Sequence, residues 1–268
     1  MLNALSQQLT ERLEAASETF GVSIHHFQSQ ESFHYNADEV FFAASIIKVP
    51  IMAAVFDQAS KGQLTMSETM TLRLEDKVTG SGILYYLSPG LQITIWDLVV
   101  LMIIESDNTA TNMLMDRIGT PTIQACMKEW GMENTRIYNK LSVVPANLQH
   151  VNTITPREMT DFMIKLAQSE IVSWKACREM IGILKQQKFN DGIPSLLPTR
   201  DEQVGEIPTY EMAHKTGWVS KNEHDSGLLY FPGHTFAISV FTGDVTDHAA
   251  TRRVMGEIGL LLYNALFK

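Results

Sequence analysis

A chain of 268 residues with 45% hydrophobic content is long enough to bury a large core, as one domain or two interleaved ones. Its formal net charge of −9 argues against a general affinity for nucleic acid or for anionic membranes. The two cysteines, Cys126 and Cys177, form neither a metal-ligand spacing nor a disulfide framework, and we expect both to be small buried hydrophobes.

The beginning of the chain shows no targeting signal. Residues 1–20 have neither a long apolar run nor a basic start, so they do not have the pattern of a signal peptide. The most apolar stretch, residues 40–56, is shorter than a membrane span and contains Lys48 and Pro50. We therefore expect no association with a membrane, and a cytoplasmic location unless an upstream export signal has been removed.

The first predicted elements are a helix and two strands. Leucines recur at helical spacing from Leu2 to Leu13, which predicts an amphipathic helix that ends before Gly21. Residues 21–27 then alternate as a strand, and a second short strand is expected at residues 34–35.

The middle of the chain, to about residue 195, is predicted to be helical with short breaks. Capping residues mark helix starts at Thr94, three residues before Asp97, and at Thr155, which precedes a proline. The expected helices span residues 45–60, 95–104, 108–118, 120–130 and 156–167. The segment between Gly131 and Thr155 has no clear periodicity, and long segments of this kind are often functional.

The last part of the chain changes to β-structure. Apolar and alternating runs predict strands at residues 210–219, 227–231 and 235–242. A closing helix is expected from Asp247 through Leu266.

Strands at both ends and helices between them predict an α+β fold. We expect an antiparallel sheet of about five strands, assembled from both termini and flanked by helices, with an inserted all-helical subdomain. Residues 1–44 and 196–268 would form the sheet subdomain, and residues 45–195 the helical one. An active site would then lie in the cleft where the two subdomains meet.

The stretch from residue 40 to 56 is apolar on every side, which predicts a helix buried in a core, yet it carries Ser45 and Lys48. A buried ammonium is costly unless it is paired or loses its proton. Because the two residues are three apart, a helix would place the hydroxyl beside an amine whose pKa burial would lower. The pair has the chemistry of a nucleophile and its base. Taken alone, a helix N-cap serine with a snorkelling lysine explains it as well.

Two further short motifs favour the chemical interpretation. Residues 106–108, Ser-Asp-Asn, fall in the break between two predicted helices, where side chains can point into a cleft. Residues 215–217, Lys-Thr-Gly, fall on a predicted strand, where the glycine allows close approach by a ligand. Taken alone, the first motif is explained as well by a helix-capping turn, and the second by an edge-strand lysine before a bend. Each occurs once, in this order, after S-x-x-K, which chance does not readily produce.

With S-x-x-K, S-D-N and K-T-G in order, the chain resembles the class A β-lactamases and the related penicillin-binding serine acyltransferases. The likeness extends to ESDNTATNML, which includes Asn112, to HKTGW and to the closing GEIGLLL helix, and covers essentially the whole chain. It implies a β-lactamase/transpeptidase-like fold. It also implies an active-site-serine hydrolase that opens β-lactam rings through an acyl-serine intermediate.

The resemblance implies a catalytic role for each motif. Ser45 would attack a carbonyl and become acylated, Lys48 would accept its proton, and Ser106 would pass a proton toward the leaving nitrogen. The backbone N–H groups of Ser45 and of Trp218, the residue after Gly217, would form the oxyanion hole.

The resemblance also implies how the substrate is held. Asn108 would hydrogen-bond the amide side chain of the substrate, and Lys215 and Thr216 would bind its carboxylate. The arginine that β-lactamases often place on the strand after K-T-G is absent, because that stretch reads HDSG, and Arg252 could reach the carboxylate from the closing helix instead. A glycine-rich turn at residues 79–82 is expected to be either one wall of the cleft or a surface loop.

The chain departs from the class A pattern at one point of chemical importance. Class A β-lactamases carry a glutamate, in the loop between the second and third motifs, that activates the deacylating water. Residues 134–157 contain no Asp or Glu and offer Asn139, Asn147, Gln149 and His150 instead. His150 has a suitable ordinary pKa for a substitute base, although a loop-stabilising hydrogen bond is the simpler interpretation.

Three functions are compatible with these observations. The first is a β-lactamase that forms an acyl-Ser45 intermediate with slow deacylation. The second, favoured by the missing glutamate, is a D,D-peptidase or esterase with the same chemistry. The third is a non-catalytic β-lactam-binding module, which the intact motifs argue against. All three imply a small-molecule β-lactam, ester or peptide ligand, and we expect no cofactor, metal or nucleic acid. The oligomeric state is not predictable from the sequence.

Overall fold

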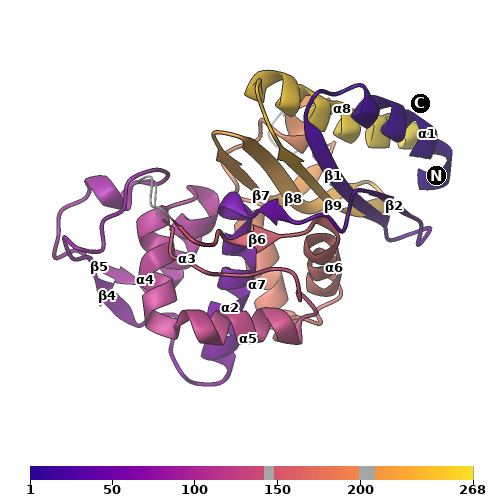
Figure 1. The fold of residues 1–268 in the computed structure, drawn as a ribbon. Coiled ribbons are helices and arrows are strands. Elements are labelled where there is room, and N and C mark those ends of the chain that lie inside the picture. Colours follow the sequence, from indigo (N-terminus) through magenta and orange to yellow (C-terminus); the bar gives the residue numbers. More distant parts are fainter. Residues whose placement is uncertain (142–147, 199–208, 268) are drawn as a thin grey trace.

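The structure, a computed structural model, describes residues 1–141, 148–198 and 209–267. Figure 1 shows the arrangement of its elements. The helices are α1 (Leu2–Glu14), α2 (Lys48–Ser60), α3 (Ile95–Ile104), α4 (Asn108–Ile118), α5 (Thr120–Glu129), α6 (Pro156–Ala167), α7 (Trp174–Leu184) and α8 (His248–Phe267). The 3-10 helices are η1 (Ala44–Ile47), η2 (Leu84–Tyr86) and η3 (Ile193–Leu196).

A five-stranded antiparallel sheet, in the order β2-β1-β9-β8-β7, organises the molecule. Its strands are β1 (Thr19–His26), β2 (Ser32–Tyr35), β7 (Glu211–Val219), β8 (Asn222–Phe231) and β9 (His234–Gly243). The predicted α+β class and the sheet built from both termini are therefore confirmed. Two small ribbons pair β3 (Phe41–Phe42) with β6 (Thr153–Ile154) and β4 (Thr69–Thr71) with β5 (Gln92–Thr94).

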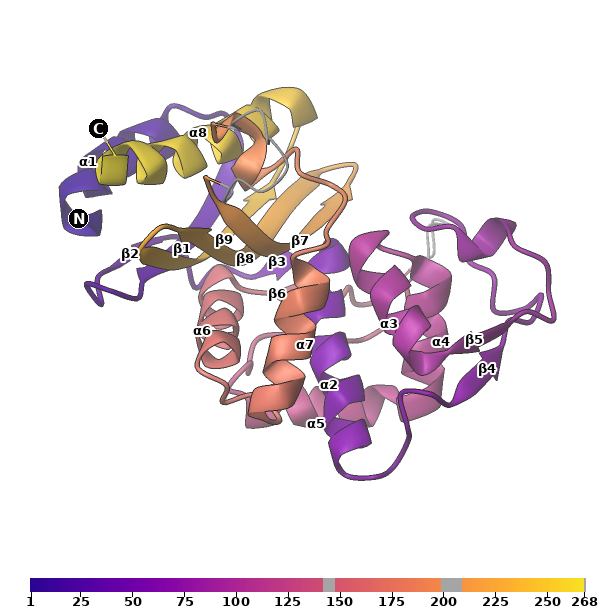
Figure 2. The same cartoon turned by 180° about the vertical axis from the view of Figure 1, so that it is seen from behind.

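Helices cover both faces of this sheet (Figures 1 and 2). Helices α1 and α8 lie side by side on one face, where their apolar residues form a core with Phe20, Val22 and Ile24. Helix α6 packs on the other face, whose apolar residues join the larger core around α2. Strand β7 is an edge strand, so one row of its backbone groups is free of sheet partners and faces the helices. The division into two subdomains at residues 45 and 196 stays a prediction.

Local signals predicted the starts of α3 and α6, whereas the helix expected from residue 45 begins as the 3-10 helix η1 and becomes α2 at Lys48. The Thr94 hydroxyl accepts from Asp97 N at 3.1 Å, and the Thr155 hydroxyl accepts from Glu158 N at 3.2 Å. Strand β8 begins at Asn222, five residues earlier than predicted, because polar residues there are buried and bonded by other strands. Among the described residues, no helix combines the length and hydropathy needed to cross a membrane.

One row of the sheet is polar on the face that packs against α6. Cross-strand pairing places the following side chains in this row: Lys215, Ser226, Ser239, Ser23 and His34. The Ser226 and Ser239 hydroxyls lie 2.7 Å apart, and the Thr160 hydroxyl lies 2.9 Å from that of Ser239 and donates to Ser23 O at 3.1 Å. Because these hydroxyls satisfy one another, the row can be buried in an apolar layer.

Two helical glycines should respond to alanine in opposite directions. A Cβ on Gly259 of α8 would lie 2.4 Å from Ile193 O, whereas a Cβ on Gly182 of α7 meets nothing within 4 Å. Gly259→Ala should therefore destabilise the fold by about 1–3 kcal/mol through overpacking. Gly182→Ala should stabilise it by about 0.5–1 kcal/mol, because alanine has the higher helix propensity. Denaturant unfolding measures both, and a stabilising Gly259→Ala would contradict the packing described.

Candidate active site

Ser45 lies in η1, directly before α2, where edge strand β7 comes close to the backbone of the serine. A Cβ on Gly217 would lie 2.9 Å from Ser45 N and 3.1 Å from Ile46 N, so only glycine permits this approach. Ala44 has a φ of 43° and Ser106 a φ of 54°, a left-handed conformation that is costly for residues other than glycine. Backbone strain of this kind is common at functional sites.

Lys48 is fully buried and is the centre of a hydrogen-bond network. Its Nζ donates to Ser45 Oγ at 3.0 Å, to Ser106 Oγ at 3.0 Å and to Asn108 Oδ1 at 2.9 Å. It also donates to Ser106 O at 2.6 Å. The structure thus brings together four residues that the first two motifs predicted to share a site.

Burial holds the pKa of Lys48 well below its ordinary value. The neighbouring charge of Lys215 lowers that pKa further, and the carboxylate of Asp107 opposes the shift. A lowered pKa favours the neutral form of the amine, and a neutral amine beside a hydroxyl can accept its proton.

Asp107, the middle residue of the second motif, does not face the cleft. Its carboxylate caps α4 through Ala110 N at 2.8 Å and accepts from the backbone N–H groups of Ile83 and Leu84 at 2.7 and 2.8 Å. It is buried, and its role is to hold the turn between α3 and α4 against η2. Ser106 and Asn108, on either side, are thereby directed toward Lys48.

The glycine-rich turn at residues 79–82 is one wall of the cleft. Gly80 and Ser81 line it, and Asn108 binds the turn through Ser81 O at 3.0 Å and Thr79 O at 3.2 Å. A Cβ on Gly82 would lie 2.3 Å from the Asp107 carboxyl group, at a φ of 103°. Only glycine therefore lets this wall pack against the second motif.

The cleft itself has a volume of about 520 Å³. Its described lining residues are Phe42, Ala44, Ser45, Gly80, Ser81, Asn108, Leu141, Trp218, Val219 and Ser220. None of them carries a charge. Trp218 is 59% exposed, so its indole offers a free apolar face at the mouth of the cleft.

Lys215 and Thr216 lie next to this cleft on β7, and both are buried. Desolvation lowers the pKa of Lys215 to about 7, and the charge of Asp225 opposes that change. Lys215 Nζ donates to Thr216 O at 2.7 Å. At neutral pH the amine is consequently divided between its charged and neutral forms.

Leu141 is a site residue that the sequence analysis missed. It lines the cleft, in the segment where class A enzymes carry their glutamate, and its backbone is fixed by the Asn112 side chain. Asn112 Nδ2 donates to Leu141 O, and Leu141 N donates to Asn112 Oδ1, both at 2.8 Å. The available signal was Asn112 itself, because a buried amide on α4 needs partners of this kind.

His150 lies elsewhere, on the exposed surface. Its ring stacks on that of Tyr138 with the centroids 4.9 Å apart, and its carbonyl accepts from Asn139 Nδ2 at 2.7 Å. It is not among the described residues that line the cleft, so its position does not support a role as deacylating base. Gln149 is likewise exposed, and Asn147 lies outside the described residues.

Arg252 is engaged by two carboxylates. Its guanidinium pairs with Asp191 and, at 3.1 Å, with Oε1 of Glu223. The other oxygen of Glu223 lies 2.6 Å from Nδ1 of His248. Burial raises the pKa of Glu223, and the bonds from His248 and Arg252 oppose this shift. Arg252 is therefore not free to bind a substrate carboxylate in the way predicted.

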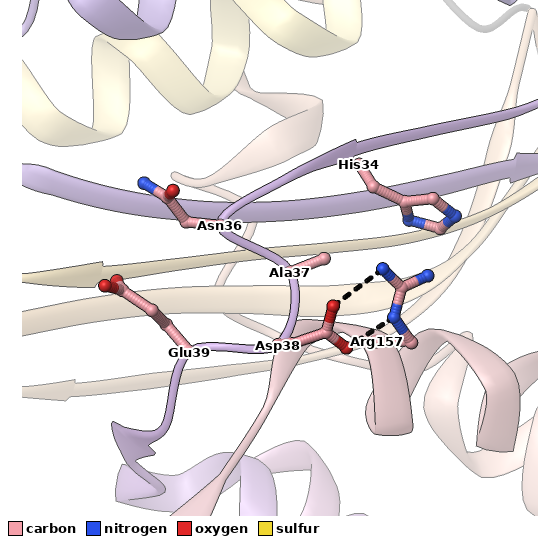
Figure 3. A pocket seen from close by; sticks show the side chains of 6 residues that line it. All are labelled: His34, Asn36, Ala37, Asp38, Glu39 and Arg157. Carbon is pink, nitrogen blue, oxygen red and sulfur yellow. Dashed lines mark hydrogen bonds and ion pairs between the residues drawn. The ribbon is translucent and has the colours of Figure 1, made fainter.

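A second hollow of about 480 Å³ lies at the β2 edge of the sheet, the edge opposite β7 (Figure 3). The Arg157 guanidinium pairs with both oxygens of Asp38 across it, at 2.5 and 2.9 Å. Figure 3 shows His34 above this pair, and no serine or cysteine nucleophile is among its lining residues. Within the described part of the chain, no group of three His, Cys, Asp or Glu residues could hold a metal ion.

Replacing Lys215 by methionine should reduce the pH dependence of stability in the alkaline range. The folded protein holds the pKa of Lys215 at about 7, whereas an unfolded lysine has a pKa of about 10.4. Between these values the unfolded state binds more protons, so stability rises with pH and the penalty is complete below pH 7. Denaturant titrations at about pH 6 and about pH 10 should show a larger gain for the wild type than for Lys215→Met. Parallel profiles would contradict the buried amine.

Comparison with known proteins places this geometry in a family. The model of the β-lactamase enzyme family matches residues 4–266. β-Lactamase VEB-1 of Pseudomonas aeruginosa is 23% identical over 288 residues, which cover 98% of this chain and 91% of that protein.

Solved structures agree over nearly the whole chain. A β-lactamase from Sphaerobacter thermophilus superposes with a TM-score of 0.89 at 29% identity, covering 99% of this chain and 97% of the other. PBP-A does so with a TM-score of 0.88 at 29% identity, covering 99% and 96%, and a leucine-to-glutamate mutant of PBP-A is known as an acyl-enzyme complex with penicillin G. The chain, with its Ser45–Lys48–Ser106 network at the edge of a five-stranded sheet, belongs to the β-lactamase enzyme family of serine hydrolases.

Proposed function

We propose that the protein reacts with β-lactams by acylation of Ser45 and that hydrolysis of the acyl-enzyme is the slow step. The observation that carries this proposal is the fully buried Lys48 amine, hydrogen-bonded to the hydroxyls of both Ser45 and Ser106. In this arrangement the base, Lys48 Nζ, contacts both the nucleophile, Ser45, and the proton carrier, Ser106.

Acylation follows from these contacts. Neutral Lys48 takes the proton of the Ser45 hydroxyl as Oγ attacks the lactam carbonyl. The ring C–N bond breaks when the tetrahedral intermediate collapses. Its nitrogen receives a proton from the Ser106 hydroxyl, which is reprotonated from Lys48 at 3.0 Å. The lysine returns to its neutral form, and the acyl group remains on Ser45.

The oxyanion hole is proposed to consist of the backbone N–H groups of Ser45 and Trp218. The close approach of Gly217 to Ser45 N supports this assignment, because it places the end of β7 beside the serine. Two fixed donors can stabilise the charge that develops on the carbonyl oxygen without reorganisation. Asn108, bound to Lys48 and lining the cleft, is proposed to bind the amide side chain of the substrate.

Deacylation is proposed to be slow because Leu141 lines the cleft in the segment that carries the class A glutamate. An apolar side chain cannot take a proton from an attacking water. His150, the substitute base that this segment of the sequence offers, is exposed and stacked on Tyr138.

The absence of the class A glutamate also favours a second function, a D,D-peptidase or esterase. Such an enzyme transfers or releases its acyl group without the class A glutamate, and the likeness to PBP-A is compatible with it. If p-nitrophenyl esters are turned over faster than nitrocefin, the esterase alternative is favoured over the β-lactamase.

Ser45→Ala should abolish covalent labelling by benzylpenicillin. Intact-protein mass spectrometry should show one adduct on the wild type and on a control, Ser67→Ala, at an exposed serine of the same chain. No adduct on the wild type with any β-lactam would reject the β-lactam assignment. If a serine-directed fluorophosphonate also fails to label it, the chain is a non-catalytic binding module.

Leu141→Glu should accelerate hydrolysis of the acyl-enzyme. A carboxylate at this cleft-lining position could activate water, a contribution of about 10²–10⁴-fold for a positioned general base. Leu141→Gln, which has the same shape without the base, is the matched control. Single-turnover decay of the penicillin adduct measures the effect, and equal rates for Glu and Gln variants would argue against the assigned position.

His150→Ala should leave adduct decay unchanged, because the ring is exposed and stacked on Tyr138. The same decay measurement tests it. Rapid wild-type turnover of nitrocefin that is lost in His150→Ala would show instead that the loop rearranges and delivers this histidine.

A further inference from the structure

Next to Trp218, the β7–β8 ribbon carries two carboxylates on the strand where β-lactamases often place an arginine. Trp218 is paired with Glu223, and Thr216 with Asp225, so each acidic side chain shares a face of the ribbon with its partner. Both acids are buried. Asp225 is committed to His214 Nδ1 at 2.8 Å and to Ile193 N at 2.9 Å.

Glu223 is the acid paired across the ribbon with Trp218, which lines the cleft. Helix α8 covers this face of the sheet (Figure 2) and brings His248 and Arg252 to the two carboxylate oxygens. The Trp218 ring lies edge-on to that of His248, with the centroids 6.3 Å apart. Glu223 is therefore one side chain removed from the cleft-lining indole.

The charge of Arg252 is neutralised by its acidic neighbours. One cation faces two carboxylates, of which Asp191 is half exposed and Glu223 is buried. Water screens the Asp191 pair, whereas the Glu223 pair is shielded from solvent and has the larger effect. Lys221, in the turn that follows the cleft, is exposed and similarly screened.

We infer that Glu223 is a specificity-determining residue: by neutralising Arg252 at the end of β7, it lowers the reactivity of the cleft toward substrates that carry a carboxylate, relative to uncharged ones. The absence of charge among the described residues that line the cleft supports this inference. So does Lys215, whose pKa of about 7 leaves it a partial cation at neutral pH. The inference rests on the proposed function, since it concerns the substrates of the same serine.

The test compares benzylpenicillin, an anion, with its uncharged methyl ester. In Glu223→Gln the shape is kept and Arg252 loses its buried counter-charge. The second-order rate constant for adduct formation with benzylpenicillin should rise roughly three- to tenfold while that with the ester stays constant. The selective gain should shrink at high ionic strength. Equal changes for both compounds, or no change, would overturn the inference.

Glu257→Gln is the matched control. Glu257 is also on α8, and it pairs with Arg253 at 3.1 Å and with Arg12, away from the cleft. The substitution removes the same net charge as Glu223→Gln. Because it does so away from the cleft, it should not alter the ratio of the two rate constants. Adding Arg252→Ala to Glu223→Gln should cancel the gain, because the gain requires the charge of the guanidinium. A gain that survives in the double variant would overturn the mechanism.

Non-covalent binding separates this inference from the proposed function. In a Ser45→Ala background, calorimetry should show tighter binding of benzylpenicillin, but not of the ester, when Glu223→Gln is added. This result is independent of acylation. Absence of any wild-type adduct would reject the proposed function alone, whereas unchanged anion binding by Glu223→Gln would reject the inference alone.

Discussion

The burial of one amine is the constraint on which the rest of the site depends. Lys48 begins α2 inside the apolar core, where a bare ammonium would be far too costly. The turn between α3 and α4 meets that demand with Ser106 and Asn108. Asp107 then fixes the turn, and the glycine-rich wall packs upon it. This network makes the lysine tolerable and aims it at Ser45, while burial itself lowers its pKa.

Edge strand β7 contributes the other half of the site, and its lysine and the acids of the neighbouring strand β8 are all buried. Lys215 is buried with a pKa of about 7, and the strand behind it carries Asp225 and Glu223. Each acid has its own basic partner, and the described residues that line the cleft carry no charge. Such a surface suits transition-state stabilisation by oriented dipoles more than strong ground-state binding of an anion.

Motifs, caps and periodicity predicted much of this protein. Residues of S-x-x-K and S-D-N share one hydrogen-bond network, and Gly217 of K-T-G lies close to Ser45 N. The helix starts at Thr94 and Thr155 are confirmed. The start of β8 was missed because its polar residues have low strand propensity and depend on distant partners, as His224 does on Phe42 O. The pairing of Arg252 was missed because its two acidic partners are 61 and 29 residues away in sequence.

By itself, the sequence determined the fold class, the family resemblance and the candidate site motifs, because these depend on local propensity and on short motifs. It also determined that residues 134–157 lack a carboxylate. Only the tertiary structure decided which side chain near that segment lines the cleft, since the backbone of Leu141 is positioned by the side chain of Asn112 on α4. It also decided which charges are free, because neutralisation depends on contacts between residues that only folding brings together.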